Sequence, residues 1–209
     1  NRVIFPIYNI NSQIVGFGGR IIEKNTNLPK YLNSPDSPIF KKGNELFGIK
    51  HQGENIRKKG FAMLMEGYLD VLTAQKNGFE NAVASLGTAL TEEQAQLLKK
   101  YTDKILISYD NDEAGKNAII KAGYILKKYD FDVKCLVIDG NEKDPDEFLR
   151  KNGKKAFIEV VKKSEEIFDF LTKEASKDLD LNDISGERKF IERLKPFFSN
   201  VKNNLNKNL

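Results

Sequence analysis

The sequence predicts an α/β protein with a parallel sheet flanked by helices, preceded by a small β-containing basic subdomain and followed by a helical bundle. Between residues 61 and 138, short apolar runs alternate with stretches of helical periodicity, which is typical of parallel strands joined by right-handed crossovers. Residues 1–60 contain 10 Lys or Arg and 4 Asp or Glu, a net charge of +6, and open with two β-like runs. From about residue 146 onward the periodicity is helical.

The first 60 residues are predicted to contain two strands, a loop and a helix. Residues 2–8 and 13–17 are apolar β-like runs separated by a turn. Residues 23–45 hold three prolines and no clean periodicity, which indicates a long loop. A helix is expected from about residue 46 to residue 58. Because the chain begins at Asn1, within a predicted strand and without Met, we expect it to be a fragment of a longer protein.

The α/β segment is predicted to contain four buried strands, over residues 61–65, 81–85, 104–109 and 133–138. The helix after the first strand ends at Gly78, where glycine permits the left-handed turn that closes a helix. Thr91 and Gln94 form a capping box that begins the second helix. A third helix has its apolar positions on one face between residues 114 and 126. Later helices are expected over 157–163, 167–177 and 187–198.

Composition narrows the chemistry that the chain can carry. The single Cys135 excludes an intrachain disulfide and any zinc site built on several cysteines, and the single His51 excludes a multi-histidine metal site within the chain. We expect Cys135 to be a buried strand residue and His51 an exposed helix residue, neither of them catalytic. The sequence contains no run of 18 apolar residues, so it does not predict a membrane-spanning helix. A metal would therefore bind carboxylates, which suit Mg²⁺ or Mn²⁺.

Acidic residues follow three of the four predicted parallel strands. They are Glu66 and Asp70 after the first strand, Asp110 and Asp112 after the third, and Asp144 and Asp146 after the fourth. Because ligands of open α/β sheets bind beyond the carboxyl ends of the strands, these acids are expected to converge on one edge. Carboxylates packed so closely repel one another unless cations neutralise them. The pattern predicts a site for two or more divalent cations that activate a hydroxyl and stabilise a leaving group in phosphoryl transfer.

Each of these motifs also has a purely structural interpretation. Taken singly, Asp-x-Asp is typical of a turn or a helix cap, and Asp-Pro-Asp is typical of a helix start with Pro145 at the first helical position. The charge division has a similar alternative. Residues 61–150 contain 11 basic and 16 acidic residues, a net charge of −5, beside the basic first segment. This suits a protein that holds a polyanion and metal cations, but it also suits ordinary solvated surface.

In four motifs the chain resembles the Toprim domain of bacterial DnaG-type primases. They are Glu-Gly-Tyr-Leu-Asp at 66–70, Ser-Leu-Gly-Thr-Ala-Leu at 85–90, Asp-x-Asp-x-Ala-Gly at 110–115 and Asp-Pro-Asp-Glu at 144–147. Upstream of these, three further motifs of the chain resemble the basic subdomain of the same family. They are Phe-Gly-Gly-Arg at 17–20, Lys-Tyr-Leu-Asn-Ser-Pro at 30–35 and Phe-Lys-Lys-Gly at 40–43. The resemblance covers roughly residues 2–160.

The resemblance implies a DNA primase catalytic core, a DNA-directed RNA polymerase that synthesises short RNA primers on single-stranded DNA by two-metal nucleotidyl transfer. It implies a basic subdomain, of which 1–59 is the C-terminal part, a Toprim catalytic domain over 60–145 and a helical subdomain over 146–209. The implied partners are the template, ribonucleoside triphosphates and, through regions outside this chain, the replicative helicase and a zinc-binding module. We expect no zinc in this fragment, no membrane contact, a monomer, and a cytoplasmic location at the bacterial replication fork.

The resemblance also implies roles by position. Glu66, Asp70, Asp110 and Asp112 would be catalytic; the metal ligands would be Glu66, Asp110, Asp112, Asp144 and Asp146; Arg20, Lys30, Asn33 and Lys42 would bind nucleotide or template. Independently, the Gly18-Gly19 pair would let the backbone approach a phosphate, and cations stand beside rings at 30–31 and 40–42, as single-strand binding requires. The alternatives are a tight strand bend at the glycines and aromatic rings that anchor the loop to the core.

Two other functions stay open on the sequence. One is another Toprim enzyme, a nuclease or a topoisomerase-like strand cleaver, because the same acids serve hydrolysis or transesterification. A topoisomerase would also need a nucleophilic tyrosine, for which none of the tyrosines has a recognisable context. The other is a non-catalytic module that only binds single-stranded DNA, which would show no metal dependence.

Overall fold

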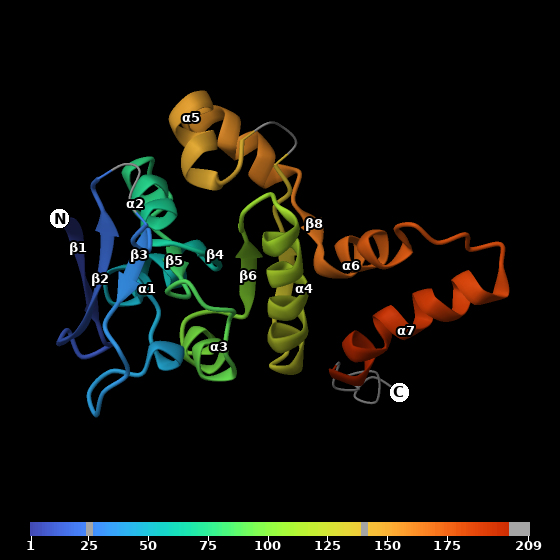
Figure 1. Cartoon of the computed structure of the whole chain (residues 1–209), viewed down its shortest axis with the longest axis horizontal. Coiled ribbons are helices and arrows are strands. Elements are labelled where there is room, and N and C mark those ends of the chain that lie inside the picture. The colour runs from blue at the N-terminus through green and yellow to red at the C-terminus, as the bar shows by residue number, and fades with distance from the viewer. Residues whose placement is uncertain (24–26, 139–141, 201–209) are drawn as a thin grey trace.

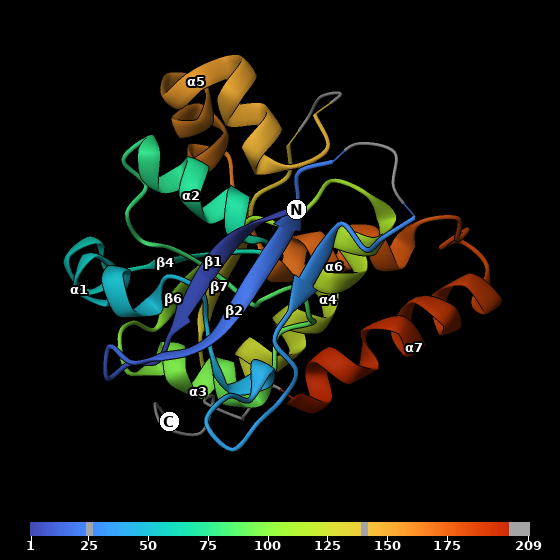
Figure 2. The ribbon, with the colours of Figure 1, turned by 60° about the vertical axis from the view of Figure 1, so that its left-hand side comes forward.

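The computed structural model describes residues 1–23, 27–138 and 142–200. A small antiparallel sheet comes first, in the order β1-β2-β3. Its strands are β1 (Arg2–Tyr8), β2 (Ile14–Ile21) and β3 (Tyr31–Asn33). Figure 2 shows β1 and β2 side by side along their length. Strand β3 and a short 3-10 helix η1 (Lys42–Asn44) lie in the stretch that the sequence predicts as a loop. The sequence does not reveal β3, because a strand of three residues paired to β2 is too short to show a periodicity.

The second sheet confirms the predicted α/β class. Its order is β5-β4-β6-β7-β8, and the first four of these strands are parallel. They are β4 (Ala62–Met65), β5 (Ala82–Ala84), β6 (Lys104–Ile107) and β7 (Asp132–Cys135). The two-residue β8 (Glu165–Glu166) adds an antiparallel edge that the sequence does not predict, because two glutamates carry no strand signal.

Helices cover both faces of the parallel sheet (Figure 1). They are α1 (Ile49–Lys59), α2 (Tyr68–Lys76), α3 (Glu92–Lys99) and α4 (Glu113–Lys128), followed by α5 (Pro145–Lys162), α6 (Ile167–Ser176) and α7 (Ile184–Asn200). The predicted capping box of Thr91 and Gln94 begins α3. Gly153, with a φ of 75°, breaks the regular helix within α5. Among the described residues, no helix is long and apolar enough to cross a membrane.

The strands are buried on both sides, so the protein has a core on each face of the sheet. On one face Leu64 and Ile107 pack among residues of α1, α3 and α4. On the other, Met63 and Met65 share a core with Phe157 of α5 and with α2. Strands β4 and β5 are therefore continuous apolar runs, as is β6 after Lys104, whereas β7 alternates, with Asp132 and Lys134 exposed. As predicted, Cys135 is fully buried in a strand and His51 is exposed on a helix.

A third, smaller core joins the N-terminal sheet to the α/β unit. It contains Phe5 and Ile7 of β1, Phe40 of the long loop, Tyr68 of α2 and Leu86. Only 1% of Phe40 is exposed, and burying such a ring contributes about 2–3 kcal/mol. Phe40 therefore anchors the loop, which is the structural alternative raised for this ring. This core fixes the basic N-terminal sheet beside the carboxyl ends of the parallel strands.

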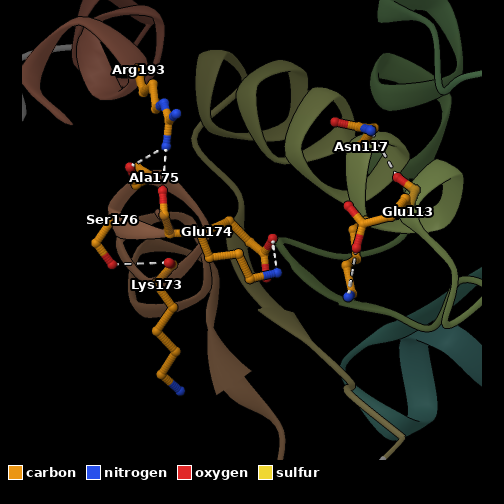
Figure 3. Close-up of polar contacts among 9 residues, drawn as sticks. Glu113, Asn117, Lys173, Glu174, Ala175, Ser176 and Arg193 are labelled. Atoms are coloured by element: carbon orange, nitrogen blue, oxygen red, sulfur yellow. Dashed lines mark hydrogen bonds and ion pairs between the residues drawn. The ribbon is translucent and has the colours of Figure 1, made fainter. Parts of the chain in front are cut away.

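The C-terminal helices lie beyond α4, on the side away from the N-terminal sheet (Figure 1). Arg193 of α7 donates hydrogen bonds of 2.9 Å to the carbonyl oxygens of Ala175 and Lys177, at the end of α6 (Figure 3). This satisfies carbonyls that have no partner within α6. The predicted helical subdomain continues to residue 209, and residues 201–209 lie outside the described ranges.

Candidate active site

A cavity of about 830 Å³ lies between the N-terminal sheet, the carboxyl ends of β4 and β6, and the start of α5. Its wall carries two kinds of charge. The acidic residues are Glu66, Asp70, Asp110, Asp144, Asp146 and Glu147, and the basic residues are Arg20, Lys30, Lys42, Arg150 and Lys151. The sequence predicts that six acids converge on one edge of the sheet. Five of them line this cavity, and Asp112 does not.

Glu66 and Asp110 occupy the centre of the acidic wall, because they follow the neighbouring parallel strands β4 and β6. The backbone N–H of Asp110 donates to Oε1 of Glu66 at 3.2 Å. Burial, and then the charge of Asp112, raise the pKa of Glu66 despite that hydrogen bond. Burial and the nearby Glu66 and Asp70 raise the pKa of Asp110 to about 7. Burial and the neighbouring carboxylates thus both disfavour the charged forms of Glu66 and Asp110.

Asp70 and Asp144 flank that pair, and both also cap helices. Asp70 is buried in the first turn of α2 and accepts from the backbone N–H of Gly67 at 3.1 Å. Burial, followed by the charge of Asp144, raises the pKa of Asp70 to about 7. Asp144 is the N-cap of α5 and accepts from the backbone N–H of Glu147 at 2.7 Å, with Pro145 at the first helical position as the structural interpretation predicts.

The two remaining predicted ligands differ from this group. Asp112 is exposed, does not line the cavity, and caps α4 by accepting from the backbone N–H of Gly115 at 2.7 Å. Its carboxylate therefore has the capping role that the sequence left open, and its role as a metal ligand stays a prediction. Asp146 is buried, and both of its oxygens accept hydrogen bonds: Oδ1 from the hydroxyl of Thr73 at 2.6 Å and Oδ2 from Arg150.

The basic wall comes from the N-terminal sheet and the long loop. Arg20 pairs with Tyr31 across β2 and β3, and Lys30 directly precedes it; the Tyr31 ring centroid is 5.8 Å from the Arg20 guanidinium and 5.6 Å from the Lys30 ammonium. Within the described part of the chain, the side chains of Arg20, Lys30 and Lys42 have no ion-pair partner. Three cations thus face the cavity with their charge available to an anion.

Asn33, the fourth predicted nucleotide contact, also lines the cavity, and its side chain makes hydrogen bonds within the protein. Its amide donates to the carbonyl of Leu86 at 3.1 Å, and its oxygen accepts from the hydroxyl of Tyr68. The close backbone approach predicted at the glycine pair is likewise made to protein, because a Cβ on Gly18 would overlap the Tyr68 ring. Tyr68 stacks on Phe5 with ring centroids 5.1 Å apart. These contacts hold β2 and β3 against α2 and so fix the distance between the two walls.

Two models of known protein domains match this chain. Residues 1–53 match the model of the DNA primase catalytic core, N-terminal domain, and residues 63–149 match a Toprim-like model. The DNA primase of Clostridium acetobutylicum is 44% identical over 193 residues, which are 92% of this chain and 32% of that primase. A primase domain from Pseudomonas aeruginosa is similar in structure, with a TM-score of 0.87 and 31% identity over 98% of this chain and 64% of that one.

The chain belongs to the DnaG-type bacterial DNA primases. A DnaG primase catalytic domain bound to single-stranded DNA is similar to it with a TM-score of 0.85 and 33% identity, over 96% of this chain and 63% of that one. The chain spans about a third of the length of the curated primases that it matches. Within the primase fold, Arg20, Lys30 and Lys42 of the cavity lie in the match to the N-terminal domain, and Glu66 and Asp110 lie in the Toprim-like match.

A Toprim domain of the primase family implies the use of divalent metal, and the acidic wall fits one in its chemistry. All of its donors are oxygens, and burial together with neighbouring carboxylates raises the pKa values of Asp110 and Asp70, so a bound cation would offset that negative charge. In the described ranges, no three acidic, His or Cys side chains come together as a complete ligand set. Mg²⁺ commonly binds one or two carboxylates and takes its other ligands from water and substrate phosphates, which suits this geometry.

Sequence reasoning missed several residues of the primase cavity. Arg150 and Lys151 line it from α5, and Thr73 reaches Asp146 from α2. The spacing of Asp146 and Arg150, one helical turn apart, was a usable signal for the first of these. The Thr73 contact joins residues 73 positions apart, so only the folded chain reveals it.

Proposed function

We propose that this chain is the catalytic part of a DNA primase that synthesises short RNA primers on single-stranded DNA at the cytoplasmic replication fork. The observation that carries the proposal is a single cavity in which clustered carboxylates face cations that have no ion-pair partner in the described ranges. The relatives support it, because similar proteins include DNA primases, and a similar catalytic domain is bound to single-stranded DNA.

The acids and the bases of the cavity have separate roles in this proposal. Glu66 and Asp110, with Asp70 and Asp144 beside them, would hold Mg²⁺ or Mn²⁺, two ions in the complete site. When bound, such ions neutralise phosphate charge and lower the pKa of a hydroxyl nucleophile. Lys30 and Lys42 would hold phosphate oxygens, and Arg20 can donate two parallel hydrogen bonds to one phosphate. Tyr31, whose ring lies near Arg20 and Lys30, offers an aromatic ring to a base.

A primer assay tests the proposal directly. The chain is incubated with a single-stranded template, four ribonucleotides and Mg²⁺ or Mn²⁺, and the products are resolved by size. RNA oligomers that depend on both template and metal are expected. Shortened template would instead indicate a Toprim nuclease, and bound but unchanged template without RNA would leave a binding module. A reaction without template and one with a chelator are the controls.

Single-stranded DNA is expected to bind the basic N-terminal residues rather than the acidic edge, and therefore to bind less tightly as salt rises. Each neutralised phosphate releases condensed counterions, with a slope of about −0.7 in log K against log salt for single strands. If Arg20, Lys30 and Lys42 neutralise three phosphates, the slope is about −2, and affinity falls about twentyfold between 50 and 200 mM salt. Fluorescence anisotropy of a labelled oligonucleotide measures this. Affinity that does not change with salt would contradict the placement.

Lys30→Ala and Lys42→Ala are each expected to weaken nucleotide or template use by roughly tenfold, because a charge-assisted phosphate contact is lost. Neither lysine has an ion pair in the described ranges, so stability should change by no more than about 0.5 kcal/mol. Steady-state kinetics and thermal unfolding measure the two effects. Lys50→Ala, at an exposed position of α1 outside the cavity, is the matched control. A large loss of stability with normal kinetics would show that the loop lysines are structural.

A further inference from the structure

The start of α5 forms a second basic wall, across the acidic centre from the N-terminal sheet. Arg150 and Lys151 line the cavity there, together with Glu147. Lys151 pairs with Glu147 at 2.8 Å, and both side chains are partly exposed. Arg150 pairs with Asp146, yet 63% of its side chain remains exposed, against 8% for Asp146. The carboxylate of Asp146 is therefore fixed in the protein interior, whereas the guanidinium of Arg150 is accessible from the cavity.

The anchor of Arg150 is rigid and is built from two helices. Asp146 is held by the Thr73 hydroxyl of α2 at 2.6 Å, which leaves its second oxygen directed to Arg150. Phe148 and Leu149, between the two members of the pair, are buried in the core that α5 shares with the sheet. Figures 1 and 2 both show α5 lying over α2. The guanidinium is therefore held in place by its carboxylate instead of moving freely in solvent.

The guanidinium keeps donors for a ligand. Arginine carries five N–H donors in a planar fork, and the described hydrogen bonds of Arg150 engage only Nη2. A fork with a fixed edge and free donors is suited to bidentate contact with phosphate. Because both Asp146 oxygens already accept hydrogen bonds from protein, Asp146 is better placed to orient Arg150 than to bind a metal.

We infer that Arg150 is a phosphate-binding residue for the polyphosphate of the incoming nucleoside triphosphate, and that Asp146 is its positioning residue. The inference rests on the proposed function in taking a triphosphate as substrate. A nucleotide is favoured over the template because a cavity of about 830 Å³ has the size of a small-molecule site and is lined by Arg150 together with the acids. The nucleotide would thus bind between two basic walls, with its polyphosphate against α5.

Titration calorimetry with MgATP as the probe tests Arg150 on the intact chain. Arg150→Ala is expected to raise the Kd about tenfold or more, because a charge-assisted contact is lost. Arg150→Lys keeps the charge and the partner Asp146 but not the fork, so it should restore only part of the affinity. Lys155→Ala, at an exposed position of the same helix that does not line the cavity, should leave the Kd unchanged.

Asp146→Asn separates positioning from metal binding. The asparagine oxygen can still accept from Thr73, while the charge that holds Arg150 is gone. We expect weaker MgATP binding, with Mn²⁺ affinity in the absence of nucleotide, measured by electron paramagnetic resonance, equal to that of the unaltered chain. A loss of Mn²⁺ affinity as large as that in Asp110→Asn would overturn the assignment of Asp146.

Three results would overturn the assignment of Arg150. One is an unaltered chain that does not bind MgATP; the second is an Arg150→Ala variant whose melting temperature falls while its Kd for MgATP is normal. The third is a loss of single-stranded DNA affinity in Arg150→Ala with normal MgATP binding, which would place the template there. Binding of MgATP that depends on Arg150 in a chain that makes no RNA would support the inference and count only against the proposed function.

Discussion

Asp110→Asn is expected to abolish metal-dependent RNA synthesis while it stabilises the protein in the absence of metal. Asp110 lies at the end of β6 and its backbone donates to Glu66, so the side chain is held at the centre of the acidic wall. Asparagine has nearly the same shape but is a neutral and poorer ligand for Mg²⁺. Removing the charge also removes repulsion from Glu66 and Asp70. Because water screens this half-buried group, we expect a gain of about 1–2 kcal/mol.

The pH dependence of stability provides a second measurement of the same effect. The pKa of Asp110 is about 7 in the folded protein and about 4 in an unfolded chain, so the folded state binds the proton more tightly. Its destabilising contribution is therefore complete above pH 7 and disappears as the pH falls from about 7 toward 4. Metal-free protein should unfold at a higher temperature at pH 5.5 than at pH 8. The Asp110→Asn variant should show a smaller difference.

Calorimetric unfolding with and without Mg²⁺, run beside the primer assay, distinguishes a metal-binding Asp110 from a purely structural one. Single-stranded DNA binding should be unchanged or slightly stronger, because the variant removes a negative charge near the template path. Asp132→Asn, at the exposed start of β7, removes the same charge elsewhere and should alter none of these properties. Near-normal synthesis by Asp110→Asn would refute the metal assignment and the catalytic proposal with it.

The sequence predicts the α/β class and the acidic edge because both follow from local order along the chain. Buried strands leave apolar runs, and residues directly after parallel strands meet at one edge, so Glu66 and Asp110 could be placed together without tertiary information. The capping box of Thr91 and Gln94 is equally local. By contrast, β3 exists only because its three residues pair with β2, and β8 only because it meets β7.

The hydrogen-bond partners of the candidate site residues are the part that the sequence could not resolve. Asp112 and Asp146 match the family motifs as well as Asp110 does, yet one caps α4 at the surface and the other is buried between Thr73 and Arg150. Asn33 has the residue type of a ligand contact but holds Tyr68 and the loop at Leu86. These hydrogen bonds are seen in the folded chain, and the roles of Asp112, Asp146 and Asn33 toward a metal or a nucleotide stay predictions.

Gly115→Ala is expected to cost stability and synthesis together, for a reason that lies in the turn after β6. Gly115 is in the first turn of α4, where its backbone N–H donates to Asp112. A Cβ at this position would lie 2.7 Å from the carbonyl carbon of Asp110 and closer still to the oxygen. Backbone atoms cannot move aside as a flexible side chain can, so the turn that carries Asp110 must shift.

The steric cost should exceed the advantage of about 1 kcal/mol that alanine has over glycine within a helix. We expect a net loss of about 3 kcal/mol, measured by denaturant unfolding, and a loss of RNA synthesis even where the variant is fully folded. Lys121→Ala, at an exposed position of the same helix, should leave both properties unchanged. A Gly115→Ala variant with normal stability and synthesis would show that the turn adapts, and that the position of Asp110 does not depend on close contact with α4.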